Sequence, residues 1–213
     1  MSVHFFAKEV SASAATVVFG LWGLLGVATP ATAQVETAVE YGFVTPWDYG
    51  YSTFFVTWFP DEIAALDAGA FDEQCCGSWQ RTGATFNVWS GPESGALPTC
   101  RFFNATSFPG DHFYTPYAAE CAAVQAHADW HYEYEGIVFY LKVPDENGNC
   151  PVGTTILYRL YFGGGGAPLH IFTTSLAGFQ TSANGWVLEG DARTGAFACV
   201  PSSTTPSMPK MLL

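Results

Sequence analysis

Short runs of aromatic and aliphatic residues alternate with turn-rich segments along most of the chain, and the order of these segments recurs three times. The three units span about residues 37–91, 98–142 and 150–201, and the first is the most diverged. In each unit two aromatic runs flank a turn, which predicts a β-hairpin. A later segment, led by Trp79, Trp130 or Trp186 in the three units, predicts one or two returning strands. Because a unit of ~45 residues cannot bury its apolar face alone, we expect the three units to share one core.

A helix of about three turns is predicted between the hairpin and the returning strands of each unit. In the middle unit Thr115 is a suitable N-cap and Pro116 suits the first helical position, while Pro60 has that place in the first unit. The corresponding stretch of the third unit is Ser175–Ala183. The expected fold class is therefore mainly β with short helices (α+β), a single domain of three pseudo-symmetric repeats in a trefoil-like arrangement.

The two ends of the chain are expected to lie outside this domain. Residues 1–33 are predicted to be a signal peptide, because an apolar run is broken by Pro30 and followed by a small-x-small pattern that ends at Ala33. The run is shorter than the ~20 residues of a membrane span, so residues 34–203 are expected to be secreted, periplasmic or at the cell surface, and not to span a membrane. Residues 204–213 are predicted to be a flexible tail.

Composition narrows the classes of partner. Hydrophobic residues make up 49% of the chain and charged residues only 12%, which is too apolar for a disordered protein. Seven basic residues against nineteen acidic ones give a formal net charge of −12, which argues against nucleic acid as a partner. No cofactor is indicated, and a monomer is the default expectation.

All six cysteines follow the predicted signal peptide: Cys75, Cys76, Cys100, Cys121, Cys150 and Cys199. An even number in an exported chain favours disulfides over metal ligation or redox chemistry. Six cysteines allow 15 connectivities, and their spacing alone does not choose among them. The adjacent Cys75 and Cys76 could pair with each other only through a strained ring.

Eight side chains are candidates for contact with a ligand: His112, Tyr114, Glu120, Trp130, Glu135, His170, Trp186 and Glu189. The two histidines occupy equivalent places at the start of the second hairpin strand. An imidazole there could contact a ligand, or it could hold the hairpin by bonding to a neighbouring carbonyl or carboxylate.

Two of the glutamates, Glu120 and Glu135, belong to one unit and could form the acid/base pair of a glycoside hydrolase, whose carboxyl groups lie ~5–9.5 Å apart. Arg101 and Arg159 recur beside such positions, so buried ion pairs are the structural alternative. No complete catalytic set is present, and we assign no catalytic residue.

His127 and His131 have the i, i+4 spacing of a metal-binding helix but lack the associated glutamate, and no metal site is predicted. The seven Trp, ten Tyr and eighteen Phe exceed what a core of this size needs. Flat aromatic faces suit sugar rings or peptide segments, and the alternative is that they fill a small β core.

These repeated motifs resemble a family of exported bacterial repeats known as domain of unknown function 5648. Its units contain Tyr-Arg-Phe/Leu-Tyr-Asn, His-Phe/Tyr-Tyr-Thr, a helix with a glutamate, Gly-Trp and Glu-Gly. The middle unit matches best, the third has Gly178 in place of the helix glutamate, and the first has Thr53 or Phe54 in place of the histidine. The resemblance covers about residues 37–201.

The resemblance implies an exported accessory module without established chemistry, and it implies the disulfides Cys100–Cys121 and Cys150–Cys199. Our preferred hypothesis is a non-catalytic binding or surface-interaction module for glycan or cell-envelope material. One alternative is a secreted hydrolase of carbohydrate or peptidoglycan that uses Glu120 or Glu135 with His112. Another is a purely structural, disulfide-stapled surface domain.

Overall fold

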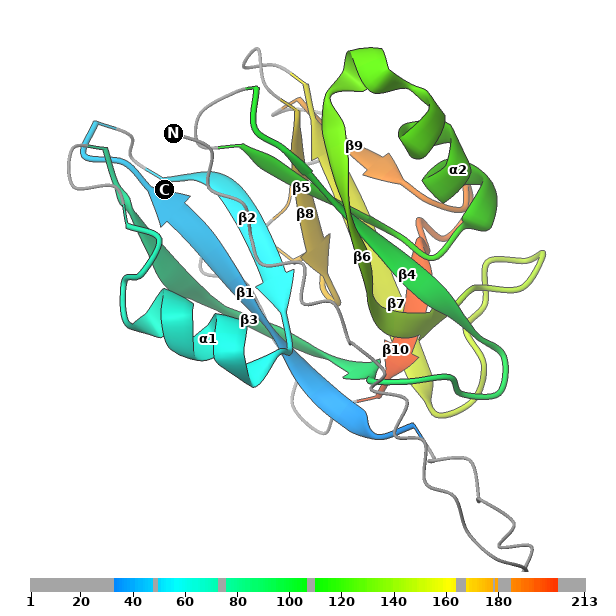
Figure 1. The fold of residues 1–213 in the computed structure, drawn as a ribbon. Helices are drawn as coiled ribbons and strands as arrows, with labels where there is room; N and C mark the ends of the chain where they lie inside the picture. Colours follow the sequence, from blue (N-terminus) through cyan, green and yellow to red (C-terminus); the bar gives the residue numbers. More distant parts are fainter. Residues whose placement is uncertain are drawn as a thin grey trace, which may run out of the picture.

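The computed structural model describes most of the predicted exported domain (Figure 1). The described residues are 33–47, 50–72, 76–106, 110–163, 168–177, 179 and 185–202. The predicted signal peptide, apart from Ala33, and the predicted C-terminal tail lie outside them.

The described part of the chain is mainly β, as expected, with short helices. The strands are β1 (Val35–Val44), β2 (Tyr51–Thr57), β3 (Ser78–Trp89), β4 (Ala96–Asn104), β5 (Asp111–Thr115), β6 (Tyr132–Lys142), β7 (Thr154–Phe162), β8 (Leu169–Thr173), β9 (Trp186–Glu189) and β10 (Ala198–Pro201). The helices are α1 (Pro60–Asp67), α2 (Ala118–Ala126) and the 3-10 turn η1 (Ala128–Trp130).

The strands form three antiparallel triplets, in each of which the first strand along the chain lies in the middle. The triplets are β2-β1-β3, β5-β4-β6 and β8-β7-β9, and we call them the first, second and third triplet. β3, β6 and β10 join them edge to edge, and the sheet curls into a nearly closed barrel (Figure 1). The second hairpin strands, β2, β5 and β8, contact one another in the middle of the molecule.

The helices lie between the second and third strands of a triplet, as predicted, but one begins later than expected. α1 begins at Pro60, whereas α2 begins at Ala118 and not at Pro116. With eight and nine residues they make between two and three turns at about 3.6 residues per turn. In the third triplet residues 175–177 and 179 are not helical, and the rest of the predicted helical stretch lies outside the described residues.

The late start of α2 has a local cause in a threonine turn. The hydroxyl of Thr115 accepts a hydrogen bond from the N–H of Tyr117 at 3.1 Å, so Thr115 closes a turn before the helix and does not cap it. Thr57 accepts the N–H of Phe59 at 3.1 Å in the same way. Thr173 accepts the N–H of Ser175 at 3.1 Å, so all three triplets make this turn.

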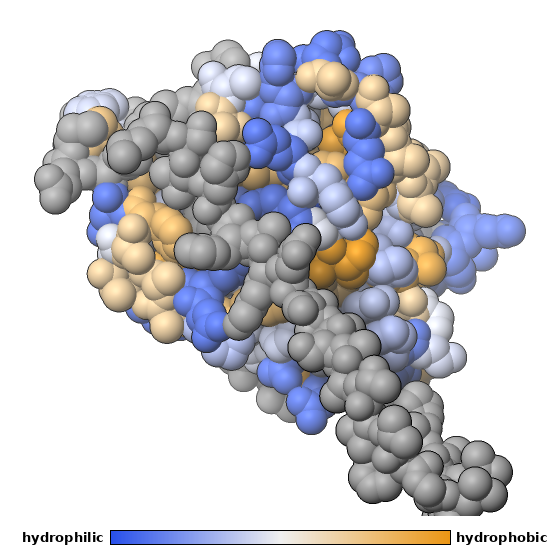
Figure 2. Space-filling model, in the orientation of Figure 1, coloured by the Kyte–Doolittle hydropathy of each residue, from blue (hydrophilic) through white to orange (hydrophobic). Residues whose placement is uncertain are grey.

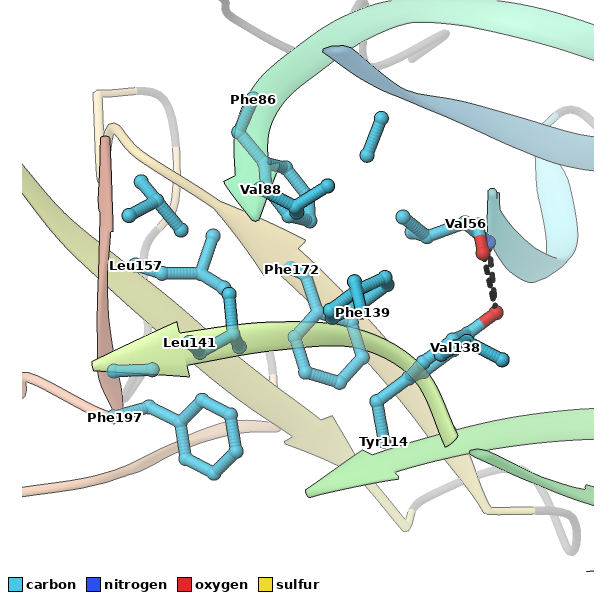
Figure 3. Packing of buried hydrophobic residues seen from close by; sticks show 13 residues of the cluster. Val56, Phe86, Val88, Tyr114, Val138, Phe139, Leu141, Leu157, Phe172 and Phe197 are labelled. Atoms are coloured by element: carbon cyan, nitrogen blue, oxygen red, sulfur yellow. Dashed lines mark hydrogen bonds between the residues drawn. The ribbon is translucent and has the colours of Figure 1, made fainter. Parts of the chain in front are cut away.

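The main core contains one residue from each of the second hairpin strands at equivalent positions: Val56 of β2, Tyr114 of β5 and Phe172 of β8 (Figure 3). The hydroxyl of Tyr114 donates to the carbonyl oxygen of Val56 and accepts its N–H, both at 2.9 Å. The Tyr114 ring stacks on Phe139 with the centroids 6.0 Å apart and meets Phe172 edge-on at 5.3 Å. These contacts hold the second triplet against the first and the third.

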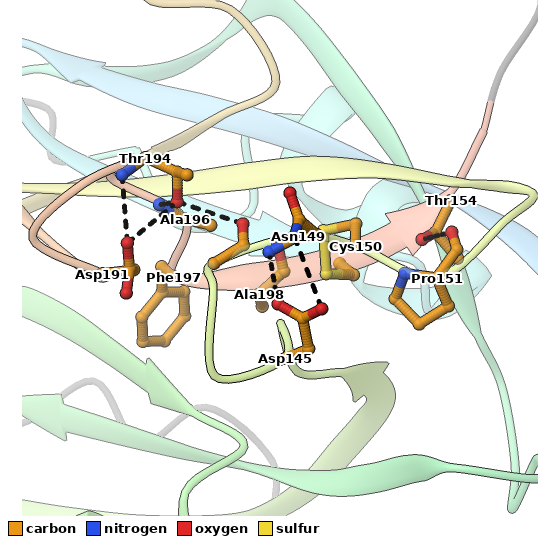
Figure 4. The surroundings of a disulfide bond; sticks show 12 residues. Asp145, Asn149, Cys150, Pro151, Thr154, Asp191, Thr194, Ala196, Phe197 and Ala198 are labelled. Carbon is orange, nitrogen blue, oxygen red and sulfur yellow. Dashed lines mark hydrogen bonds between the residues drawn. A yellow bond between two sulfur atoms is a disulfide. The ribbon is translucent and has the colours of Figure 1, made fainter.

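Two disulfides connect elements within the second and third units, and both are the pairs that the family resemblance implies. Cys100 of β4 bonds to Cys121 of α2, and Cys150, which precedes β7, bonds to Cys199 of β10. Beside the second of these, Asp145 accepts the N–H of Asn149 at 2.9 Å and fixes the turn that leads into Cys150 (Figure 4). Cys76 is disulfide-bonded, and Cys75, which the sequence analysis left as one possible partner for it, lies outside the described residues.

Removing the two described disulfides is expected to destabilise the domain unequally. On a chain-entropy argument, Cys100→Ala/Cys121→Ala costs about 3 kcal/mol and Cys150→Ala/Cys199→Ala about 4 kcal/mol, because the second disulfide closes the longer loop. The sequence separations are 21 and 49 residues. Urea unfolding of both variants beside the oxidised wild type measures the difference. An unchanged unfolding midpoint in either variant would contradict the expectation.

Candidate functional site

Most of the predicted site residues lie in two clusters of charged side chains at the borders between triplets. The first arginine cluster consists of Glu62, Arg101, His112 and Glu135. The second arginine cluster consists of Glu120, Arg159, His170 and Glu189. They are built alike, with an arginine from the middle strand of one triplet between a helix glutamate of the preceding triplet and a strand glutamate of its own.

In the first arginine cluster the guanidinium of Arg101 is buried, with 3% of the side chain exposed. Its Nη2 lies 2.8 Å from Oε1 of Glu62 on α1, and its Nε lies 2.8 Å from Oε2 of Glu135 on β6. The guanidinium also lies over the ring of Phe55 at 5.1 Å. Arg101 thereby ties α1 and β2 of the first triplet to the second.

The second arginine cluster repeats these contacts at the next border. Nη2 of Arg159 lies 2.8 Å from Oε1 of Glu120 on α2, and its Nε lies 2.9 Å from Oε2 of Glu189 on β9. The guanidinium lies 4.9 Å from the ring centre of Phe113, which has the place of Phe55. This cluster is less deeply buried, because about a third of each carboxylate side chain is exposed.

The Glu135-Gly136 pair places the strand glutamate of the first arginine cluster at a β-bulge, whereas Glu189 lies directly opposite Arg159. Gly136 has φ 115°, a value that favours glycine, and the register between β4 and β6 shifts beside it. The extra residue of this bulge is Glu135, whose side chain meets Arg101. Gly83 has φ 87° where the register between β1 and β3 shifts in the same way.

Both predicted histidines are buried at the start of the second hairpin strand. Nε2 of His112 lies 3.8 Å from Oε2 of Glu135, and Nε2 of His170 lies 3.7 Å from Oε2 of Glu189. Each ring meets a phenylalanine of the preceding triplet edge-on, with centroid distances of 4.6 Å to Phe55 for His112 and 5.1 Å to Phe113 for His170. The histidines therefore belong to the packing between triplets.

Burial and the arginines set the protonation of the clusters. Burial lowers the pKa of His112 well below its usual value, and the positive charge of Arg101 lowers it further, so this imidazole is neutral at pH 7. Burial raises the pKa of Glu135, and Arg101 offsets part of this effect. For Glu120 the effect of burial is outweighed by the hydrogen bond and charge of Arg159, and the pKa is lowered.

Asp111 is a buried member of the second border that the sequence analysis did not select. Its Oδ2 accepts the hydroxyl of Tyr132 at 2.5 Å and lies 2.9 Å from Nδ1 of His170. The repeat gave no signal for it, because the corresponding residues of the other units are Thr53 and Leu169. In the sequence, only its position beside the candidate His112 could have marked Asp111 as a site residue.

The two predicted tryptophans have different surroundings. Trp186 of β9 lies opposite Phe162, just as Trp79 lies opposite Phe43, so these tryptophans are equivalent. The residue at this position of the second triplet is Tyr132, which lies opposite Asn104. Trp130, aligned with them in sequence, instead belongs to η1, where 45% of it is exposed.

Tyr114 is the one remaining candidate, and it lies in the core with 2% exposed. Burial raises the pKa of its hydroxyl above the usual value. The eight predicted residues thus form two border clusters, a core tyrosine and two separate tryptophans. The structure does not bring them together around one cavity.

The border between the third triplet and the first has a different arrangement. Glu40 of β1 lies opposite Val56 of β2. This is the position at which β4 and β7 carry their buried arginines. The carboxyl of Glu40 is fully buried and accepts the hydroxyl of Thr82 at 2.9 Å. Thr82 precedes Gly83, so it has the place of the strand glutamates. A carboxyl and a hydroxyl here replace a guanidinium and a carboxylate.

No group of three or more His, Cys, Asp or Glu side chains among the described residues could hold a metal ion. Within the same residues, no helix has the length and apolar character needed to cross a membrane. The chemistry that the two arginine clusters offer is charge pairing, since every carboxylate in them contacts an arginine.

Comparison with known proteins gives one match. A family model described as a domain of unknown function (DUF5648) matches residues 69–196, a narrower range than the resemblance predicted. The matched range contains β3, the second triplet and β7–β9, and it leaves out β1, β2 and β10. No curated protein and no solved structure matches the chain.

Breaking the first arginine cluster is expected to destabilise the domain strongly. Arg101→Met leaves two largely buried carboxylates without their cation, which costs ~3–5 kcal/mol of unfolding free energy. The matched control is Arg81→Met, because Arg81 pairs with Asp67 at 2.6 Å with about half of each side chain exposed. Chemical unfolding should show a much smaller loss for the control. Equal losses would contradict the role given to burial.

Glu40 is expected to make stability fall as pH rises. Burial raises its pKa from 4.5 to about 8, so the folded state holds a proton that the unfolded state releases. Its stabilising contribution is complete below pH 4.5 and is lost as pH rises to about 8, with a slope of at most ~1.4 kcal/mol per pH unit. Urea unfolding between pH 4.5 and 8 should show that Glu40→Gln removes this slope. Glu36→Gln on the same strand is the control, and parallel curves for wild type and Glu40→Gln would contradict the prediction.

Proposed function

The chain belongs to the family described as a domain of unknown function (DUF5648), and we propose that it is an exported, non-catalytic binding module for glycan or cell-envelope material. The observation that carries this proposal is the engagement of the candidate catalytic groups. The glutamates of both arginine clusters pair with arginines, and His112 is enclosed between Phe55 and Glu135. These groups hold triplets together, which leaves them unsuited to flank a substrate.

A glycoside hydrolase requires a carboxylic acid whose pKa is raised, so that it can protonate the leaving oxygen. Glu120 has the opposite property, because Arg159 lowers its pKa. Glu135, the other carboxyl of the hydrolase hypothesis, does have a raised pKa, but it contacts Arg101 at 2.8 Å and only 9% of its side chain is exposed, so it is poorly placed to reach a substrate. These observations favour binding over hydrolysis.

The proposal extends to the architecture, as three pseudo-symmetric repeats in a trefoil-like arrangement. Three features that recur along the chain support it: the antiparallel triplets, the threonine turns after β2, β5 and β8, and the two arginine clusters. Repetition of this kind provides several loops and outer strands on one rigid frame, which suits a recognition domain.

Export and surface character are also parts of the proposal. Disulfides form and persist in oxidising compartments outside the cytosol, and the two described here support such a location. Outside the grey atoms of Figure 2, hydrophobic residues form small groups between hydrophilic ones. A face of this mixed character suits a polar, hydroxyl-rich ligand better than it suits a partner that binds through a large apolar interface.

The proposal is tested by ligand binding and turnover together. We expect an oxidised preparation of residues 34–213 to show a raised melting temperature with at least one member of a panel of glycans and peptidoglycan fragments. Glu120→Gln should retain this binding, and neither protein should release reducing ends. Circular dichroism checks that the variant is folded.

Two results would contradict the proposal in different ways. Turnover by the wild type that Glu120→Gln abolishes would identify a hydrolase. A panel in which no compound changes the melting temperature would favour the purely structural role.

A further inference from the structure

We infer that the segment His127–His131, between α2 and β6, is the docking site for a ring of an uncharged saccharide, with Trp130 as the stacking surface. This inference rests on the proposed function and names a site and a ligand class for it. It uses none of the residues of the arginine clusters.

Trp130 is exposed although the fold does not need it there. The register gives its expected structural position to Tyr132, which meets Asp111 through its hydroxyl. Trp79, at that position of the first triplet, has 9% of its surface exposed, whereas Trp130 has 45%. A large aromatic surface that is left in water and makes no core contact is a candidate for ligand contact.

Several contacts fix Trp130 in place. Its N–H donates to the carbonyl oxygen of His127 at 3.0 Å, and its own carbonyl oxygen accepts the side-chain amide of Asn104 at 2.9 Å. The rings of His127 and Trp130 are stacked, with centroids 4.2 Å apart and planes inclined by 14°. The two hydrogen bonds fix the backbone of Trp130, and the stacking with His127 restrains its side chain, which reduces the conformational freedom that the indole loses when a ligand binds.

The segment also contains an unusual backbone conformation. His131 has φ 58°, and among the described residues it is the one non-glycine residue with a positive φ. Its N–H donates to the carbonyl oxygen of Ala128 at 3.2 Å and closes η1 just before β6. A left-handed residue commonly ends a helical turn, and here it lets the chain enter β6 at the next residue.

Polar groups beside the ring point to a hydroxylated, uncharged ligand. Asp129 exposes 77% of its side chain and lies 3.5 Å from Nδ1 of His127, so a carboxylate and an imidazole are available to sugar hydroxyl groups. Glu133 follows two residues after the segment, and the chain carries a net charge of −12. Anionic sugars would be repelled by these charges, whereas the C–H face of a neutral sugar ring can pack on the indole.

The test uses the oxidised protein with cellotetraose and chitotetraose as uncharged probes and tetragalacturonate as an anionic one. We expect at least one uncharged probe to quench tryptophan fluorescence and to bind in calorimetry. Trp130→Ala should weaken that binding about tenfold or more. Trp47→Ala is the matched control, because Trp47 is 63% exposed and has no place in the proposed site, and it should bind as the wild type does.

The outcomes separate this inference from the proposed function. Full binding by Trp130→Ala, with any uncharged probe, would overturn the site while the binding function stands. Preference for tetragalacturonate would overturn the ligand class. If neither uncharged probe binds but peptidoglycan fragments raise the melting temperature, this inference fails alone, and if nothing binds both proposals fail.

Discussion

The guanidinium groups of Arg101 and Arg159 determine how the triplets of strands sit on one another. A buried guanidinium is costly unless it is paired and hydrogen-bonded, and here each arginine meets a helix glutamate from one triplet and a strand glutamate from the next at the same time. The threonine turns and the Glu-Gly bulge serve this pairing, because they position the two glutamates. The histidines and phenylalanines then fill the space around each ion pair.

Much of the fold follows from the sequence because hairpins and helices are local. Alternating aromatic runs gave the three hairpins, and the family resemblance gave both described disulfides. The start of α2 did not follow, because Thr115 can cap a helix or close a turn and only the structure distinguishes these uses. The alignment of Trp130 with Trp79 failed for a related reason, since cross-strand register, and not residue type, decides equivalence.

The sequence identified most of the residues of the arginine clusters, but it identified their structural role only in part. The ion pairs were one of two interpretations of the glutamates, but the sequence could not show that Arg101 and Arg159 reach the helix glutamates of the preceding unit, because that depends on how distant units pack. The sequence also did not predict that Glu40 takes the position of the buried arginines at the border between the third triplet and the first. A single acidic residue in the diverged first unit matches no repeated motif. The family match begins after this strand, which agrees with the divergence of the first unit.

The placement of the disulfides has a mechanical consequence. Cys100–Cys121 and Cys150–Cys199 each close a loop inside one unit, and neither crosses a border. Tension applied between the ends of the domain is therefore resisted at the borders by non-covalent contacts, namely the side-chain contacts and the short strand pairings of β3 with β6 and of β6 with β10. After those contacts break, the residues inside the two disulfide-closed loops still cannot extend. The end-to-end length of the unfolded domain under force is therefore shorter than that of the reduced chain.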